Sequence, residues 1–152
     1  MRITKWGEYG ILCCIHLAKR GTEVAVGAAE LSKYQAIPLQ YTQQILQRLR
    51  RGKIVVSVRG PGGGYKLSRD PSLINLKDIL YAAEGNTFEV ICDNHTIPCH
   101  KYPSRCVLQP VWRQLKEKVD ELLEGQSLAS LVQAATHVSP PMVLNTEEPA
   151  QV

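Results

Sequence analysis

Three of the five cysteines lie close together in the sequence and could bind a metal group. Cys92, Cys99 and Cys106 follow one another with six residues between neighbours. Thiolates are soft ligands that bind iron-sulfur clusters, zinc or copper(I) in preference to hard cations. Structural zinc usually has ligands roughly two to four residues apart, so the wider, even spacing favours an iron-sulfur cluster. Zinc and inert thiols are the alternatives.

The other two cysteines, Cys13 and Cys14, lie in an apolar stretch, and we expect them to be small buried side chains. An odd number of cysteines argues against a disulfide framework. The apolar runs of the chain are far shorter than the roughly 20 residues that span a bilayer. The first residues lack the pattern of a signal peptide. We therefore expect a cytoplasmic protein without a membrane partner.

Basic residues are concentrated in the segment 47–69, although the whole chain has a formal net charge of only +4. This segment contains basic residues and no acidic one: Arg48, Arg50, Arg51, Lys53, Arg59, Lys66 and Arg69. Such a patch attracts polyanions such as DNA. A solvated basic surface without a partner is the alternative.

The segment 37–52 has the pattern of a recognition helix that starts after a proline and ends at a glycine. Its apolar residues fall at helical spacing for one buried face: Tyr41, Ile45, Leu46 and Leu49. Glutamine pairs with adenine and arginine with guanine in the major groove. The candidate DNA contacts in this helix are Gln40, Tyr41, Gln43, Gln44, Arg48 and Arg51. An ordinary exposed polar face is the alternative.

The residues after this helix predict a β-hairpin, with strands at 54–58 and 65–68 joined by a glycine-rich turn. Arg59 and Gly60 begin the turn, and we expect both to contact DNA. No Gly-Lys-Ser/Thr sequence leads from these glycines into a helix, which argues against a nucleotide-binding loop. A recognition helix followed by a hairpin is typical of a winged helix-turn-helix, whose wing lies along the DNA backbone or minor groove.

The pattern as a whole predicts a mainly α-helical protein with a small β-hairpin. A winged helix-turn-helix DNA-binding domain is expected over residues 1–85, beginning with helices at 8–20 and 28–34. The three spaced cysteines lie in a loop at 86–107, which we expect to bind the cluster. Residues 108–138 are expected to form a long dimerisation helix and a C-terminal helical segment.

The dimerisation helix is expected over about four turns from Leu108 to Leu123, with an apolar stripe on one face. A long helix outside a small DNA-binding domain needs a partner for such a stripe, so we expect a homodimer. Packing of the stripe within its own monomer is the alternative. The proline-containing tail at 139–152 is expected to be disordered.

Several motifs together resemble the Rrf-type winged-helix transcription regulators, in particular the iron-sulfur branch that includes IscR, NsrR and RirA. The resemblance covers residues 1–135, and it is carried by Met1-Arg2-Ile3-Thr4, the stretch 41–50, the wing sequence 58–65 and the three spaced cysteines. It implies a homodimeric DNA-binding regulator, in our interpretation a repressor, that senses iron, redox state or nitric oxide through an iron-sulfur cluster. It implies no enzymatic activity.

The sequence departs from this branch at the fourth cluster ligand. IscR-like members have a histidine three residues after the last cysteine, and this chain has Gln109 there. Members similar to NsrR take an acidic ligand from the first helix of the other subunit, which makes Glu8 of the partner subunit the candidate. His95 and His100 are alternatives in the loop itself. Three cysteines with an oxygen ligand resemble the four-iron sites of NsrR-like members more than the two-iron site of IscR, so the resemblance favours a 4Fe-4S cluster, with 2Fe-2S as the alternative.

Two other functions are alternatives to this interpretation. A regulator of the same fold could lack a cluster, bind zinc, or sense a partner protein. A redox enzyme or cluster carrier is less well supported, because no nucleotide motif, paired carboxylate site or Cys-x-x-Cys pair accompanies the three cysteines.

Overall fold

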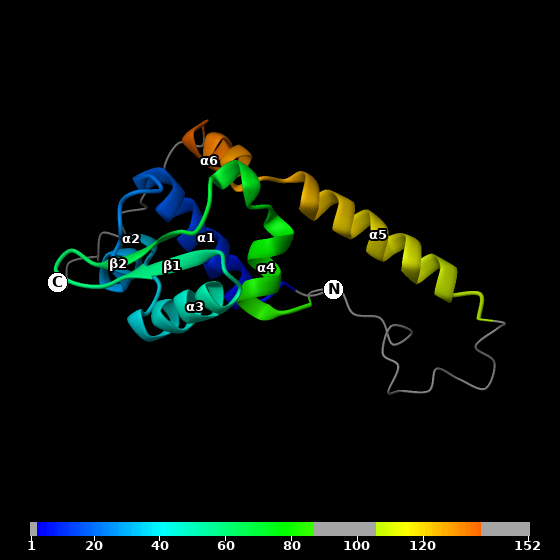
Figure 1. Ribbon diagram of the computed structural model, residues 1–152. Helices are drawn as coiled ribbons and strands as arrows, with labels where there is room; N and C mark the ends of the chain where they lie inside the picture. The colour runs from blue at the N-terminus through cyan, green and yellow to red at the C-terminus, as the bar shows by residue number, and fades with distance from the viewer. Residues whose placement is uncertain (1–2, 87–105, 138–152) are drawn as a thin grey trace, which may run out of the picture.

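The mainly α-helical class with a small β-hairpin is confirmed by the computed structural model, which describes residues 3–86 and 106–137 (Figure 1). The elements within these ranges are α1 (Lys5–Arg20), α2 (Ala28–Gln35), α3 (Leu39–Arg51), β1 (Val55–Val58), β2 (Gly64–Leu67), the 3₁₀ helix η1 (Pro71–Leu73), α4 (Leu76–Glu84), α5 (Gln109–Gly125) and α6 (Leu128–His137). None of these described helices is both long and apolar enough to cross a membrane. The expected tail at 139–152 lies outside the described residues.

Helix α1 begins at Lys5, almost a turn before the start expected at residue 8. The hydroxyl of Thr4 accepts a hydrogen bond from the Trp6 N–H at 3.2 Å, which caps the helix. Gly21 ends the helix with a φ of 94°, a conformation that glycine adopts at little cost. The earlier start places Trp6 and Glu8 on the first turns of α1.

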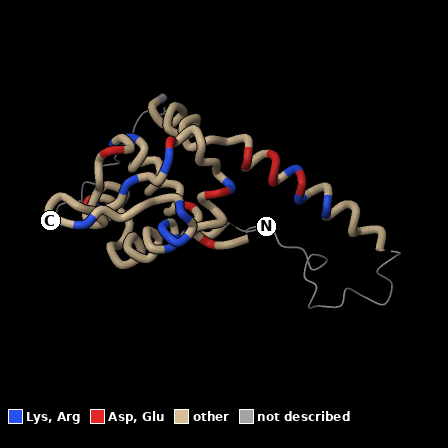
Figure 2. The backbone as a smooth tube through the Cα atoms, viewed as in Figure 1, with Lys and Arg blue, Asp and Glu red and all other residues tan. Residues whose placement is uncertain are grey.

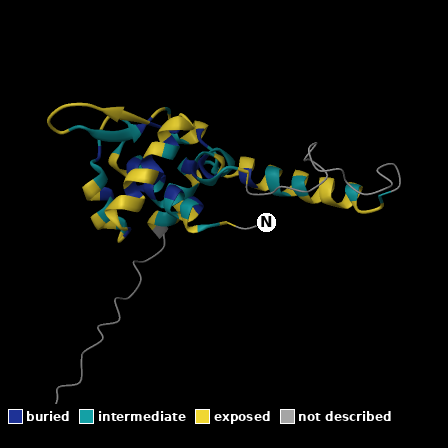
Figure 3. Ribbon diagram, turned by 90° about the horizontal axis from the view of Figure 1, so that it is seen from below, coloured by how far each residue is buried: buried dark blue, intermediate teal, exposed yellow. Residues whose placement is uncertain are grey.

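The core forms where α1, α3 and α4 pack together, as the buried residues in Figure 3 show. Helix α1 approaches α4 closely because it has glycines at the contact. A Cβ atom at Gly7 would lie 2.7 Å from Glu84 Oε1, and one at Gly10 would lie 2.9 Å from the Ala83 Cβ. The first turns of α1 are therefore fixed against the C-terminal end of α4.

Helices α2 and α3 form the helix-turn-helix, joined by three residues. Ala36 has a φ of 53°, in the left-handed region, and its N–H donates to the carbonyl of Ser32. The Ser32 hydroxyl donates to the Ile37 carbonyl at 2.7 Å. Ile37 is buried, and Pro38 is the N-cap residue of α3, so the helix starts directly after the proline as the sequence predicted. This turn sets the angle between the two helices.

The wing is the antiparallel hairpin β1–β2, paired from Val55 opposite Leu67 to Val58 opposite Gly64. The β-prone stretch before α2 contributes only Val26, which forms an isolated bridge to Tyr65 with two hydrogen bonds of 2.9 Å. The bridge joins the base of the wing to the chain leading into α2.

Helix α5 projects away from the rest of the molecule (Figure 1), and the view turned by 90° shows the same (Figure 3). Among residues 3–86 and 106–137, the contacts that anchor it to α4 lie at its C-terminal end. Leu123 is buried there, and Lys77 Nζ of α4 lies 3.2 Å from Asp120 Oδ2 and 2.7 Å from Glu124 Oε1. The chain then returns through α6, which packs against α1.

Candidate functional site

The recognition helix α3 buries one face and exposes another, as its sequence predicted. Its buried residues are Thr42, Ile45, Leu46 and Leu49. Tyr41 was expected in this stripe, but it is 47% exposed, because Thr42 occupies the buried position and donates its hydroxyl to the Pro38 carbonyl. The exposed polar side chains are Gln40, Gln43, Gln44, Gln47, Arg50 and Arg51. The outward face therefore consists of amide and guanidinium groups without a carboxylate.

Arg48 differs from the other candidates on α3, because its side chain is half-buried rather than outward. Its Nη1 donates to the carbonyl of Ala83 at 2.9 Å, and its guanidinium carbon lies 4.1 Å from the centroid of the Trp6 ring. The Trp6 ring also lies 5.2 Å from the ring of Tyr41, centroid to centroid. Two of the expected DNA contacts thus flank the indole of α1.

The C-terminal end of α3 has the hydrogen bonds of a Schellman motif. The N–H of Lys53 donates to the Arg50 carbonyl at 3.0 Å, and the N–H of Ile54 donates to the Leu49 carbonyl at 2.9 Å. Lys53 has a φ of 58°, a position where glycine is more common. This geometry turns the chain from the recognition helix directly into the wing.

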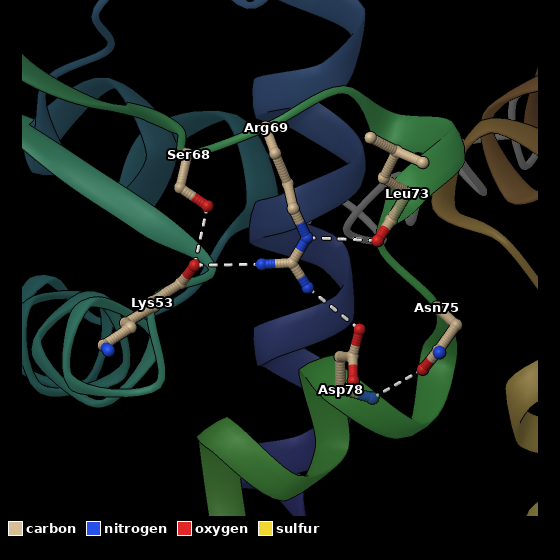
Figure 4. A network of polar contacts seen from close by, with 6 residues as sticks. All are labelled: Lys53, Ser68, Arg69, Leu73, Asn75 and Asp78. Atoms are coloured by element: carbon tan, nitrogen blue, oxygen red, sulfur yellow. Dashed lines mark hydrogen bonds and ion pairs between the residues drawn. The ribbon is translucent and has the colours of Figure 1, made fainter.

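Arg69 connects the wing to both neighbouring helices (Figure 4). It donates from Nη1 to the Lys53 carbonyl at 3.2 Å, from Nε to the Leu73 carbonyl at 3.0 Å, and from Nη2 to Asp78 Oδ2 at 2.9 Å. The Ser68 hydroxyl donates to the same Lys53 carbonyl at 2.6 Å. The end of α3, the base of the wing and the start of α4 are therefore held by one guanidinium group.

The wing turn carries Arg59 and Gly60, both exposed. Gly60 has a φ of 100° and no atom within 4 Å of a Cβ placed there, so its backbone is open to a ligand. Not every basic residue of the segment 47–69 is free: Lys66 Nζ lies 3.2 Å from Glu23 Oε2, and Arg69 is bound as described above. Figure 2 shows the basic residues of α3 and the wing on the same body, away from the mixed charges of α5.

The candidate cluster ligands are only partly within the described residues. Cys106 is partly exposed and precedes α5, whose first residue is Gln109. Glu8 is exposed on α1, with its Oε2 atom 2.7 Å from Lys5 Nζ. Cys92, Cys99, His95 and His100 lie outside the described residues. Over residues 3–86 and 106–137, no group of three or more metal-binding side chains occurs.

Cys13 and Cys14 are fully buried in α1, as expected. Burial raises the pKa of Cys13 to about 12, because the thiolate would lose its hydration. Burial likewise raises the pKa of Cys14, with a further contribution from the neighbouring Cys13. Neither thiol is suited to bind metal as a thiolate, so these cysteines are part of the core.

The chain matches the Rrf2 family, described as iron-dependent transcriptional regulators, over residues 3–134. It is also 34% identical over 132 residues to the HTH-type transcriptional regulator IscR of Yersinia pseudotuberculosis, an alignment that covers 87% of this chain and 79% of that protein. The chain belongs to the Rrf2 family. IscR of Photorhabdus laumondii matches with the same identity and coverage. Rrf2 relatives are named as transcription regulators and not as enzymes, so the chain is a transcription regulator of the IscR type.

Solved structures of Rrf2 proteins have the same fold. The structure of T. potens IscR has a TM-score of 0.72 at 26% identity, covering 92% of this chain and 93% of that chain. CymR, the global cysteine regulator of B. subtilis, has a TM-score of 0.71 at 26% identity, covering 88% and 98%. Because two regulators with different names fit equally well, the backbone fold does not by itself identify the signal.

Sequence reasoning missed two features of this site. It treated Arg69 as one member of a basic patch, and it assigned no role to Trp6. The sequence signal for the structural role of Arg69 is an acidic residue nine positions later, Asp78, with which it could form an ion pair. For Trp6 the signal is a large aromatic residue on the first turn of a helix, where it can lie against another element.

Proposed function

We propose that the protein is a homodimeric DNA-binding repressor that senses iron, redox state or nitric oxide through an iron-sulfur cluster. The observation that carries the proposal is the evenly spaced set Cys92, Cys99 and Cys106, which accompanies a winged helix-turn-helix in an Rrf2 chain. The proposed units are the DNA-binding domain at 1–85, the cluster loop at 86–107, the dimerisation segment at 108–138 and the tail at 139–152.

The proposed DNA interface consists of the outward face of α3 and the wing. Its residues are Gln40, Tyr41, Gln43, Gln44, Arg51, Arg59 and Gly60. Amides and guanidinium groups hydrogen-bond to base edges, and a wing arginine fits a narrow minor groove or the backbone. The Schellman turn at Lys53 and the Arg69 contacts support this proposal, because they hold α3 and the wing in one fixed arrangement. Arg48 was expected in this interface, and its contacts lead to the separate inference below.

The proposed dimer interface is the apolar stripe of α5. Its residues are exposed in the single chain: Leu108 (53%), Val111 (52%), Trp112 (39%), Leu115 (43%) and Leu122 (64%). A second copy of the helix related by a twofold axis would cover them. The dimer would then place two recognition helices at a fixed separation, as half-sites one helical turn apart require.

The donor set fits an iron-sulfur group, because three soft thiolates can each bind one iron ion of the cluster and a carboxylate oxygen can bind a further iron ion. Cys92, Cys99 and Cys106 would hold the cluster, with Glu8 of the partner subunit as the proposed fourth ligand and 4Fe-4S as the favoured type. The cluster would be the part of the protein whose chemical state responds to iron supply, oxidation or nitric oxide. Glu8 would have to leave Lys5 to bind it, and both side chains are exposed enough to move.

The experiment that tests the cluster measures iron, sulfide and the visible spectrum of protein purified without oxygen. Wild type should be brown, and Cys99→Ala should lose both colour and iron. Cys13→Ala should keep both, because the Cys13 thiol is buried in the core. A colourless wild type that resists anaerobic reconstitution would overturn the proposal. Glu8→Ala should change the spectrum, and an unchanged spectrum would remove Glu8 from the ligand set.

A second candidate is an Rrf2 regulator without an iron-sulfur cluster, which binds zinc or senses a partner protein. The likeness to CymR, a global cysteine regulator, supports this alternative. Zinc content of the same preparation separates it from the first proposal. Salt-dependent binding to duplex DNA separates both from a redox protein or cluster carrier, which should not bind.

A further inference from the structure

Arg48 lies in the last turn of the recognition helix, yet its interactions are with the interior of the same chain. The carbonyl of Ala83 that accepts from Arg48 Nη1 belongs to the last turn of α4. Carbonyls at this end of a helix have no partner within the helix, and a cation there is favourable. The guanidinium carbon lies over the indole ring of Trp6. Arg48 therefore both caps α4 and holds the first turn of α1.

The end of α4 is joined to the start of α1 by a second set of contacts. Glu84 Oε2 accepts from the Thr4 backbone N–H at 3.0 Å and from the Thr4 hydroxyl. The same hydroxyl caps α1 by accepting from the Trp6 N–H. Together with Arg48 and Ala83, these residues form a closed set of contacts, which we call the Arg48 cluster: Thr4, Trp6, Arg48, Ala83 and Glu84.

The Arg48 cluster joins the recognition helix to the C-terminal end of α4 and to the first turn of α1. Glu84 stands two residues before the loop proposed at 86–107. Glu8, which is proposed to bind the cluster of the other subunit, follows Trp6 by two residues. Arg48 contacts both ends at once, because it donates to Ala83 and lies over Trp6, and Tyr41 of the same helix also lies against Trp6.

We propose that Arg48 is a positioning residue that fixes the recognition helix to the ends of α1 and α4, and that it does not contact DNA phosphates. This inference rests on the proposed DNA-binding function, but not on the iron-sulfur cluster. The Ala83 hydrogen bond and the Trp6 ring hold the guanidinium against the interior of the same chain. Arg51, one turn later on the same helix, is exposed and gives a matched control.

The experiment compares Arg48→Gln, Arg48→Lys and Arg51→Gln in binding to one duplex, the sequence that the wild type selects most strongly from a random pool. Affinity is measured as a function of salt by fluorescence anisotropy. A lost phosphate contact lowers the slope of log K against log salt by about 0.9. Both glutamine variants remove the same charge, so a difference between their slopes reports on contacts.

We expect Arg48→Gln to weaken binding by about tenfold, since one charge-assisted hydrogen bond is lost, with the wild-type salt slope. Arg48→Lys should weaken binding similarly, because an ammonium group restores the charge without the planar guanidinium. Arg51→Gln should lower the slope. Emission from Trp6 should change in both Arg48 variants and stay constant in Arg51→Gln, with Trp112 common to all three.

A lowered slope in Arg48→Gln together with wild-type affinity in Arg48→Lys would identify a phosphate contact and overturn the inference. Circular dichroism confirms that each variant is folded, and Arg48→Lys alone decides the outcome if Arg48→Gln does not fold. A wild type without salt-dependent DNA binding would refute the proposed function itself, and this inference with it.

Discussion

The exposed stripe of α5 gives a quantitative prediction about the dimer. Truncating a fully buried leucine to alanine removes three carbon atoms, each worth about 0.8 kcal/mol. Leu122 is 64% exposed in the single chain, and a dimer would cover this exposed part. The same fraction of the truncation energy is about 1.5 kcal/mol per subunit. A twofold dimer contains the residue twice. Leu122→Ala should therefore weaken dimerisation by about 3 kcal/mol, or about 150-fold in the dimer Kd.

Leu115 has a smaller expected effect because it is less exposed. Its 43% exposure scales to about 1 kcal/mol per subunit and about 30-fold in the dimer Kd. Glu117→Ala, on the opposite face of the same helix, is the control and should leave the dimer Kd unchanged. Sedimentation equilibrium over a range of concentrations measures all three variants.

The order of the effects is the decisive result. If Leu122→Ala and Leu115→Ala both dimerise within threefold of wild type, the stripe is not the dimer interface. If Glu117→Ala dissociates the dimer as strongly as the leucine variants, the effect arises from the helix as a whole. Circular dichroism should show unchanged helix content, because both leucines are exposed in the single chain.

Two further predictions concern the folded DNA-binding domain. Ala36→Gly should raise the free energy of unfolding by up to about 1 kcal/mol, because a left-handed φ of 53° is strained for alanine. Urea denaturation measures this change. A lower free energy of unfolding would show instead that the greater entropy of glycine in the unfolded state dominates. At pH 8, Cys13 should react with a thiol reagent only in unfolded protein, since burial raises its pKa to about 12 and keeps the thiol protonated at pH 8. The partly exposed Cys106 should react in the folded apoprotein. Rapid labelling of Cys13 in folded protein would refute the burial argument.

The elements of the DNA-binding domain could be predicted because their signals are local. The apolar positions of α3 recur at helical spacing, and the glycine-rich turn at 59–64 separates two β-prone runs. The start of α1 was missed because the cap at Thr4 was not recognised as a helix start. The bridge between Val26 and Tyr65 was not predicted, because this pairing depends on how the wing lies against the domain.

The contacts that orient the site could not be predicted in the same way. Arg48 meets Ala83 across 35 positions of sequence, and Arg69 meets Lys53 across 16. Both contacts exist only after the helices have packed, so a guanidinium that binds a carbonyl looks the same in sequence as one that binds DNA. The cysteine set was identified from residue type and spacing alone, and that prediction rests on chemistry rather than on contacts.

Because α5 is anchored at its C-terminal end, a displacement at its N-terminal end would rotate the helix about that anchor. The distance along the helix from its first residue, Gln109, to the base at Leu123 is about 21 Å. A displacement of about 2 Å at the cysteine end would turn the helix by about 5° about its base. Lys77 stands at that pivot, and its two carboxylate partners lie one turn apart on α5. Because the ammonium group contacts both carboxylates at once, it would keep at least one of them when the helix turns by such a small angle.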